Sequence, residues 1–318
     1  MLESPAIRTQ EVTKQFGEQL AVDHLTFTVP WGVIFGFIGP SGSGKTTTIR
    51  LLTGLTKPTS GKVTVLGATP AEFTQKMRAR LGHMPQHFVL YQDLSIWENL
   101  NFAASLYGLS RQERKRLEGL LEFVELSEHK RKLVRNISGG MQRRLSLAAT
   151  LAHEPELVFL DEPTAGVDPI LRRKFWTRFE TLKEEGRTLF ITTQYVSEAA
   201  YCDFVGVIAE GRLLAVDTPQ ALRRRAYGGE IVDLYTAEYL EARHLAGLRA
   251  HPLIKSLQPL GNKGWRAVVD DSGTAMPQLM KWSQEQNLTL ESIEEYLPPF
   301  DDVFVELVSN GKPNASLA

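Results

Sequence analysis

The sequence has one cysteine, Cys202, in 318 residues, and no apolar stretch long enough to cross a bilayer. A lone cysteine excludes an internal disulfide framework and suits a reducing compartment. The longest apolar stretch, residues 31–38, falls far short of the roughly 20 residues that a membrane helix needs. Glu3, Pro5 and Arg8 interrupt the start of the chain, so we expect no signal peptide there.

Charge of either sign is not in excess. Lysine and arginine number 36 against 37 acidic residues, which gives a formal net charge of −1. Without a basic excess there is no electrostatic argument for a nucleic-acid partner. The sequence also lacks internal repeats and low-complexity tracts, and its length exceeds that of one ordinary domain.

A glycine-rich octapeptide is the most informative stretch that is present. It fits the pattern G-x-x-x-x-G-K-[ST] and consists of Gly39, Pro40, Ser41, Gly42, Ser43, Gly44, Lys45 and Thr46. An apolar run at 32–38 predicts a buried strand before it, and residues 46–55 predict a helix after it. In that context the backbone N–H groups of the loop and the helix N-terminus form a cradle for phosphate. A glycine-rich turn that binds nothing is the alternative, and the strand and helix on either side argue against it.

The last two residues of this loop predict its ligand. Lys45 is expected to reach the β- and γ-phosphates, and the Thr46 hydroxyl is expected to ligate Mg²⁺. The sequence therefore predicts that the chain binds a nucleoside triphosphate.

Two carboxylates end a second apolar run. Residues 157–160 are apolar and precede Asp161 and Glu162, which predicts a buried parallel strand with charge at its carboxyl end. Ligands of open α/β sheets bind at that end of the strands. Asp161 is therefore expected to hold hydrated Mg²⁺, and Glu162 to accept a proton from the attacking water. Alone, two acids after a strand are weak evidence, because acids often end strands in solvent.

A third element lies between these two. Ser138, Gly139 and Gly140 precede a helix expected from Met141 to residue 151, and they form a second helix start rich in free N–H donors. By itself Ser-Gly-Gly is an ordinary cap. Placed between a phosphate loop and an Asp-Glu strand, it resembles the signature sequence of ATP-binding cassette (ABC) proteins.

Further residues match this family in order over residues 6 to about 220. Phe16 lies where the family has its adenine-stacking aromatic residue. Gln86 matches the glutamine near the γ-phosphate, which also serves the Mg²⁺. Asp168 ends a loop similar to the one that crosses the family's dimer interface. The resemblance implies that ATP and Mg²⁺ are the cofactors and that Thr47, beside Thr46, contacts the nucleotide.

One position departs from the family. After the apolar strand at 189–193, the family normally has a histidine that reaches the γ-phosphate, whereas this sequence has Gln194 followed by Tyr195. Glutamine keeps a donor and an acceptor but does not titrate near neutral pH. A degenerate, slow ATPase is one interpretation. The other is an active ATPase in which Lys45 and Glu162 are catalytic and Gln194 is a neutral clamp, that is, an uncharged side chain that holds the γ-phosphate.

The predicted fold is α/β. It comprises a P-loop (RecA-like) ATPase core with an antiparallel β subdomain and a helical signature subdomain at about 93–150, all within residues 1–226. Capping boxes at 95–98 and 110–113 are expected to start helices in this subdomain. Residues 229–309 read as βαββαβ, a small ferredoxin-like α+β domain, with helices at 237–248 and 274–286 and a last strand at 288–293. We expect it to serve dimerisation or regulation, and residues 310–318 to form a flexible tail.

The function that the resemblance implies is that of a transporter ATPase. Residues 82–109, 138–141 and 301–307 look like the multidrug, antibiotic and lipid exporter branch of the daunorubicin-resistance type. There, a separate integral-membrane permease docks on the ATPase, here near residues 86–110, and holds it at the cytoplasmic face of the membrane. A second copy or close homologue completes the two nucleotide sites.

Two other functions remain open. An importer ATPase is one, although sugar importers carry a C-terminal β-barrel that the α/β pattern after residue 229 does not resemble. A soluble ABC ATPase acting on DNA or ribosomes is the other. The compact stretch between Lys45 and Ser138, the single cassette and the balanced charge argue against it.

Overall fold

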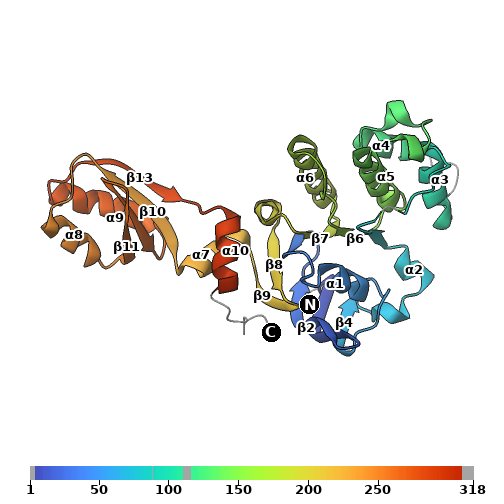
Figure 1. The fold of residues 1–318 in the computed structure, drawn as a ribbon, viewed down its shortest axis with the longest axis horizontal. Helices are drawn as coiled ribbons and strands as arrows, with labels where there is room; N and C mark the ends of the chain where they lie inside the picture. The colour runs from blue at the N-terminus through green and yellow to red at the C-terminus, as the bar shows by residue number, and fades with distance from the viewer. Residues whose placement is uncertain (1–3, 88, 110–115, 310–318) are drawn as a thin grey trace. The chain divides into compact units, whose positions relative to one another are not determined.

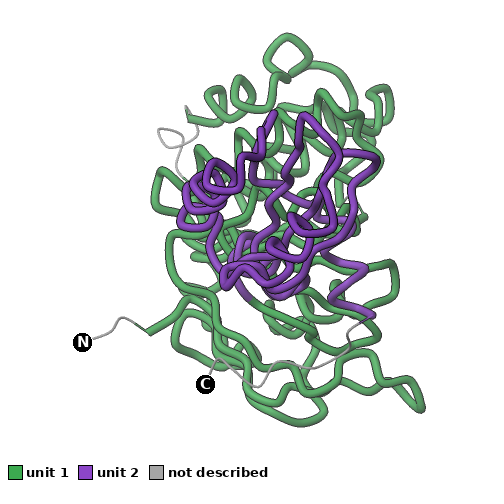
Figure 2. Tube along the Cα trace, turned by 90° about the vertical axis from the view of Figure 1, so that its left-hand side faces the viewer, with its two compact units in different colours: residues 1–216, 313–318 green, residues 217–312 purple. Residues whose placement is uncertain are grey.

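The computed structural model describes residues 4–87, 89–109 and 116–309. The chain divides into two compact units; the described part of unit 1 extends to Val216, and unit 2 begins at Asp217 (Figure 2). The sequence placed this boundary after residue 226. It falls earlier because helix α7 (Pro219–Tyr227) packs on helix α10 (Phe300–Ser309) and so belongs to unit 2. The predicted second capping box, at 110–113, and the predicted tail, at 310–318, lie outside the described residues.

Unit 1 is built on a six-stranded sheet with the order β5-β6-β7-β3-β8-β9. Its strands are β3 (Ile34–Ile38), β5 (Leu81–Met84), β6 (Leu157–Asp161), β7 (Thr188–Thr193), β8 (Phe204–Ala209) and β9 (Arg212–Asp217). Strands β5, β6, β7, β3 and β8 pair in parallel. Strands β3, β6 and β7 are buried along their whole length, which explains their apolar sequences. Their carboxyl ends therefore share one edge of the sheet.

A three-stranded antiparallel sheet packs on this core in the order β2-β1-β4. Its strands are β1 (Ile7–Phe16), β2 (Gln19–Val29) and β4 (Ser60–Val65). Phe27 of β2 stacks on Phe35 and Phe190 of the central sheet, with ring centroids 5.7 and 6.1 Å apart. These buried rings fix β3, and with it the start of the glycine-rich loop, against the antiparallel sheet. The predicted P-loop core with an antiparallel subdomain is confirmed.

The helices of unit 1 are α1 (Lys45–Leu52), α2 (Gln75–Arg78), α3 (Ile96–Leu106), α4 (Arg116–Phe123), α5 (Gly139–Leu151) and α6 (Pro169–Glu184). Figure 1 shows α3, α4 and α5 gathered to one side of the central sheet. Ser95 and Glu98 form the predicted capping box at the start of α3.

The helical subdomain contains more irregular chain than the sequence suggested. Two short 3₁₀ turns, Ser127–His129 and Val134–Asn136, separate α4 from α5. Backbone hydrogen bonds explain this, because Trp97 N donates to Lys130 O at 2.9 Å and Val134 N donates to Leu94 O at 3.0 Å. The loop thus bonds to Leu94 before α3 and to Trp97 in its first turn, as well as within its own 3₁₀ turns.

Unit 2 has the predicted βαββαβ order. It consists of β10 (Glu230–Thr236), α8 (Ala242–Arg249), β11 (Ile254–Leu260), β12 (Gly264–Val269), α9 (Ser272–Glu285) and β13 (Leu290–Tyr296). The strand order is β11-β12-β10-β13 and every pair is antiparallel, as in ferredoxin-like folds. Val232, Leu234 and Leu279 belong to its separate core.

Two boundaries in unit 2 differ from the sequence expectation. Helix α8 begins at Ala242 rather than at 237, because Ala237 N donates to Thr289 O at 3.0 Å and the chain there still pairs with its neighbour. Strand β13 runs from Leu290 to Tyr296 rather than over 288–293, since Tyr296 pairs with Ile231 of β10. Within the described residues, no helix has both the length and the apolar character to span a membrane.

Candidate functional site

The glycine-rich loop connects β3 to α1, and two of its glycines are sterically required. A Cβ on Gly39 would lie 2.1 Å from Ile208 O, and one on Gly44 would lie 2.6 Å from Ala21 O. Gly42 and Gly44 have φ angles of +79° and +105°, which favour glycine. The loop is therefore pressed against the neighbouring backbone in a conformation that other residues do not tolerate.

The start of α1 is suited to an anion. Gly44 is its N-cap and contributes no side-chain hydrogen bond, and the first turn contains no acidic residue. The Ser43 hydroxyl is buried and has no hydrogen-bond partner among the described residues. Free N–H groups, the positive end of the helix dipole and an unpaired hydroxyl together fit phosphate oxygens. Thr46 and Thr47 lie half-buried in the first turn.

The Lys45 ammonium is directed back over this loop. Its Nζ donates to Gly39 O at 2.8 Å and to Pro40 O at 2.9 Å. It also lies 3.3 Å from Glu162 Oε1, and the two side chains are only 4% and 9% exposed. The structure thus brings together the lysine of the loop and the glutamate that the sequence predicted as catalytic base.

Asp161 and Glu162 stand at the carboxyl end of β6, as predicted. Asp161 Oδ1 accepts a hydrogen bond of 2.6 Å from Thr192 Oγ1 of β7. Glu162 N donates to Thr192 O and to Thr192 Oγ1, at 3.1 and 3.0 Å. Glu162 has a φ angle of +50°, an uncommon conformation for a residue with a side chain. Thr192, which the sequence analysis did not single out, therefore orients both acids.

Gln86 follows β5 and contacts the same glutamate. Its Nε2 donates to Glu162 Oε2 at 3.0 Å. The buried Arg143 of α5 donates to Gln86 O at 3.3 Å and to Ala165 O at 3.2 Å. Burial lowers the pKa of Arg143, while Glu162 and Asp161 oppose this change. Sequence reasoning missed Arg143, whose only local signal is a charge on the buried face of α5.

Gln194 is solvent-exposed and directly follows β7. Thr193 O, one residue earlier, accepts a hydrogen bond of 3.3 Å from Gly39 N, so the end of β7 is tied to the start of the phosphate loop. Tyr195 N in turn donates to Thr193 Oγ1 at 3.0 Å. The strand order thus places Gln194 at the same sheet edge as Lys45.

Phe16 lies at the end of β1 with 46% of its surface exposed. The Lys14 ammonium stands 4.9 Å from its ring centroid. A half-exposed ring on a hairpin can offer a face to an adenine base. Its predicted stacking role remains a proposal.

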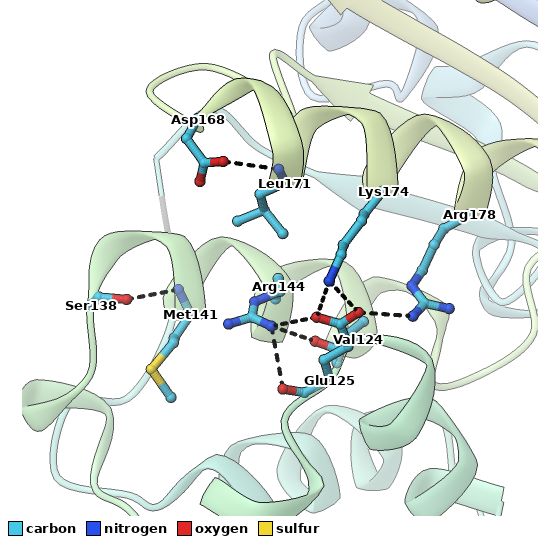
Figure 3. Close-up of polar contacts among 9 residues, drawn as sticks. All are labelled: Val124, Glu125, Ser138, Met141, Arg144, Asp168, Leu171, Lys174 and Arg178. Atoms are coloured by element: carbon cyan, nitrogen blue, oxygen red, sulfur yellow. Dashed lines mark hydrogen bonds and ion pairs between the residues drawn. The ribbon is translucent and has the colours of Figure 1, made fainter.

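Ser138 and Asp168 both cap helices (Figure 3). Ser138 Oγ accepts from Met141 N at 3.3 Å, and Asp168 Oδ1 accepts from Ile170 N and Leu171 N at 3.1 and 3.0 Å. Gly139 has open space where a Cβ would lie. No hydrogen bond or ion pair among the described residues joins Ser138 to the phosphate loop. One chain therefore presents two separate helix starts with the N–H donors that could bind an anion.

Glu125 links the two helices that begin at these caps (Figure 3). Arg144 of α5 lies 3.5 Å from its carboxylate, and Lys174 and Arg178 of α6 lie 3.0 and 3.7 Å away. The hydrogen bond from Lys174 is the main reason that the pKa of Glu125 is lowered. This cluster is half-exposed, so each pair adds little to stability.

The residues present fit a magnesium ion held together with nucleotide. Within the described chain no group of three or more His, Cys, Asp or Glu side chains could enclose a metal. Mg²⁺ needs no such cage, because it keeps several waters and uses one or two carboxylates and substrate phosphates. The Asp161 carboxylate, the Thr46 hydroxyl and the Gln86 amide oxygen are hard oxygen donors of the kind that would hold it.

Comparisons with known proteins agree with this geometry. Residues 22–165 match the family model described as ABC transporter. The probable multidrug ABC transporter ATP-binding protein YbhF of Escherichia coli is 41% identical over 71% of this chain, but the chain spans only 39% of its length. The daunorubicin resistance ATP-binding protein DrrA3 of Streptomyces coeruleorubidus is 34% identical over 96% of this chain and 97% of its own.

A solved structure is similar as well. It is a dimeric ATP-binding cassette in a post-hydrolysis state bound to ADP and Pi, 25% identical, with a TM-score of 0.62 over 67% of this chain and 98% of that one. The fold, the phosphate loop and these relatives agree, and the sequence-based resemblance is confirmed: the chain belongs to the ABC transporter family, as an ATP-binding subunit with the family's ATPase domain.

Proposed function

We propose that this chain hydrolyses ATP to power export of a drug-like or lipid-like substrate through a separate membrane permease. The contact of Glu162 with both Lys45 and Gln86 carries this proposal. These two contacts bring the lysine of the phosphate loop, a buried carboxylate and a neutral amide together at one edge of the sheet. The names of the relatives, which concern multidrug transport and daunorubicin resistance, favour export over import.

In the proposed reaction, the loop N–H groups and Lys45 hold the β- and γ-phosphates. Asp161 would hold a Mg²⁺ ion, which would supply positive charge to the phosphate oxygens. Glu162 accepts the proton of the water that attacks the γ-phosphate, the bond from the γ-phosphorus to the bridging oxygen breaks, and ADP leaves. Gln86 orients the Glu162 carboxylate. Gln194 holds the γ-phosphate and the water without exchanging a proton, since an amide does not titrate near neutral pH.

The Ser138 helix start requires a second chain in this proposal. Within one chain it lies apart from the phosphate loop, yet it has the free N–H groups of an anion site. A head-to-tail pair lets each Ser138 end meet the nucleotide held by the other chain's Lys45 loop. The similar dimeric cassette bound to ADP and Pi supports this arrangement.

Sedimentation tests the paired state. Full-length Glu162→Gln with ATP and Mg²⁺ should sediment as a dimer, because the γ-phosphate contacts both chains and is not consumed. ADP should leave it monomeric or shift it far less. Equal association with both nucleotides contradicts the proposal.

The permease is proposed to dock on an exposed apolar surface beside Gln86. This surface, which we call the α3 patch, consists of Val89, Tyr91, Phe102, Leu106 and Tyr107. Val89 and Leu106 are 77% and 63% exposed. Tyr91 packs edge-on against Phe102, with centroids 4.8 Å apart. Exposed aromatic rings packed on each other, with exposed apolar residues nearby in the chain, are typical of an interaction site.

Asn99 gives the α3 patch a fixed shape. Its side chain is buried, and its amide accepts from Tyr91 N at 2.8 Å and donates to Tyr91 O at 3.0 Å. The loop that carries Tyr91 is therefore anchored to α3. An apolar surface anchored in this way suits a short helix of the permease, whose position would then depend on the nucleotide bound near Gln86.

Membrane association tests this docking. Tagged full-length protein expressed in its own organism should pellet with membranes and co-purify with a polytopic protein. Phe102→Glu and Leu106→Glu should release it while ATP binding persists. Leu55→Glu, at an exposed leucine outside the patch, is the matched control and should stay bound. Unchanged membrane binding of both patch variants contradicts the assigned surface.

Unit 2 is proposed to serve dimerisation or regulation. Its exposed apolar side chains include Leu297, Val305 and Val308. Val305→Glu with Val308→Glu should weaken self-association without changing ATP affinity. An unchanged sedimentation profile contradicts a dimerisation role of helix α10, which contains Val305 and Val308.

A further inference from the structure

Arg172 of α6 makes three contacts with one guanidinium group. Its Nη2 donates to Val167 O at 3.3 Å. Its Cζ lies 3.9 Å from the centroid of the Tyr195 ring. Its Nε lies 3.6 Å from Glu198 Oε1. The face of the group is thus used by an aromatic ring and its edge by a carbonyl and a carboxylate.

These contacts join two loops of the candidate site. Val167 directly precedes Asp168, whose loop faces the second chain in the proposed dimer. Tyr195 directly follows Gln194, and Glu198 lies one turn further along the same segment. Arg172 is therefore the side chain through which the Asp168 loop and the Gln194 segment are held together.

Breaking the contact between Arg172 and Glu198 would cost free energy, because the carboxylate is buried. The Glu198 side chain is only 2% exposed, and that of Arg172 is 25% exposed. A buried carboxylate requires a counter-charge, and the guanidinium provides it. Arginine alone can meet all three partners, because it is planar and donates from its edge while stacking with its face. Lysine would keep the charge but lose the stacking and the fixed edge.

Gln194 has a particular need for such support. A glutamine side chain has one more rotatable bond than histidine, so holding it in one conformation costs more entropy. Gln194 itself is exposed. Its backbone is held from one side by the Thr193 contact with the phosphate loop and from the other by Tyr195.

We propose that Arg172 is a positioning residue, which sets Gln194 against the γ-phosphate by stacking on Tyr195 and ties that position to the Asp168 loop. The inference rests on the proposed clamp role of Gln194. It goes beyond that role because it assigns the residue that couples the clamp to the loop facing the second chain.

Four variants of the full-length chain test this. Arg172→Lys and Tyr195→Leu should each lower kcat about tenfold, with KM for ATP within about twofold, because the phosphate loop still binds the nucleotide. Tyr195→Phe keeps the ring and should stay within about twofold of the parent. Arg178→Lys is the matched control, since Arg178 also lies on α6, stacks on Phe123 and faces Glu125, away from Gln194. It should leave kcat within about twofold.

Two comparisons decide whether Arg172 acts through Gln194. In a Gln194→Ala background, Arg172→Lys should cause no further loss of kcat. An equal loss in both backgrounds overturns the proposal, as does an equal loss in Arg178→Lys. If Gln194→Ala alone has the parent kcat, the proposed clamp role of Gln194 is wrong. The coupling of the Asp168 loop to the Gln194 segment is then tested by amide hydrogen exchange.

Amide hydrogen exchange of the protein without nucleotide tests whether Arg172 couples the Asp168 loop to the Gln194 segment. Arg172→Lys should speed exchange in both segments, 164–168 and 194–199, whereas Arg178→Lys should change neither. Faster exchange in only one segment, or in neither, overturns the coupling independently of activity.

Discussion

Glu162 Oε1 lies 3.3 Å from Lys45 Nζ, and both side chains are almost fully buried. The pair connects the phosphate loop after β3 with the end of β6, across the intervening strand β7. The other oxygen of the same carboxylate accepts from Gln86 after β5. In the proposed reaction an arriving γ-phosphate would compete with Glu162 for Lys45, and the contact between Glu162 and Gln86 would change with it.

Glu162→Gln should retain ATP binding and lose turnover. Removing a positioned general base typically costs about 10²–10⁴ in rate, or about 3–5 kcal/mol of barrier. Equilibrium binding of a fluorescent ATP analogue and phosphate release measure the two effects separately. Lys45→Ala should weaken both. Glu156→Gln, at an exposed glutamate paired with Arg80, is the control and should match the parent. Hydrolysis by Glu162→Gln at the parent rate would show that another group is the base.

The sequence predicted the parts of this site that lie in continuous motifs. The octapeptide, Asp161 and Glu162 fall at the strand ends where the pattern placed them, because apolar runs of buried parallel strands are easy to recognise. Arg143 and Thr192 were missed, since their importance depends on carbonyls and carboxylates supplied by other strands. The start of α8 was wrong for a similar reason, because Ala237 forms a hydrogen bond with Thr289, distant in sequence.

Gly44→Ala should impair folding of the loop and nucleotide binding more than Gly42→Ala does. Both have positive φ angles, so each alanine should cost about 1–2 kcal/mol from backbone strain. Only the Cβ at Gly44 also collides with backbone, 2.6 Å from Ala21 O, whereas nothing lies within 4 Å at Gly42. Urea unfolding and ATP affinity of the two variants measure the difference. Equal losses would mean that strain alone sets the requirement for glycine.

Acidification should destabilise unit 1 through two half-buried histidines. Burial lowers the pKa of His83 and of His153 below the ordinary value of 6.5. The unfolded chain then binds more protons than the folded one, so stability rises with pH up to about 6.5 and is lost as pH falls below it. Each histidine contributes at most about 1.4 kcal/mol per pH unit.

The urea unfolding midpoint at pH 7.0 and 5.5 measures this effect. His153 Nε2 donates to Leu81 O at 2.8 Å and the ring stacks on Tyr107, so His153→Gln should lower the midpoint at pH 7.0 but make it less sensitive to pH. His87→Gln, at an exposed histidine, should keep the parent's pH dependence. A parent midpoint that does not change between the two pH values contradicts the prediction.

Gln194 should make catalysis insensitive to histidine-like titration at this position. The family's histidine gains a proton near pH ~6.5, whereas an amide keeps its donor and acceptor throughout this range. The profile of kcat against pH for the parent should therefore lack a step that appears in Gln194→His, which should otherwise be active because it retains a donor at the γ-phosphate.

Gln194→Ala removes the contact and should lower kcat about tenfold or more while KM changes little. Ser197→Ala, at an exposed position three residues further on, should leave kcat unchanged. An unchanged kcat in Gln194→Ala would show that the position has lost its contact with the phosphate, and identical pH profiles for Gln194→His and the parent would show that no proton transfer passes through it in either form.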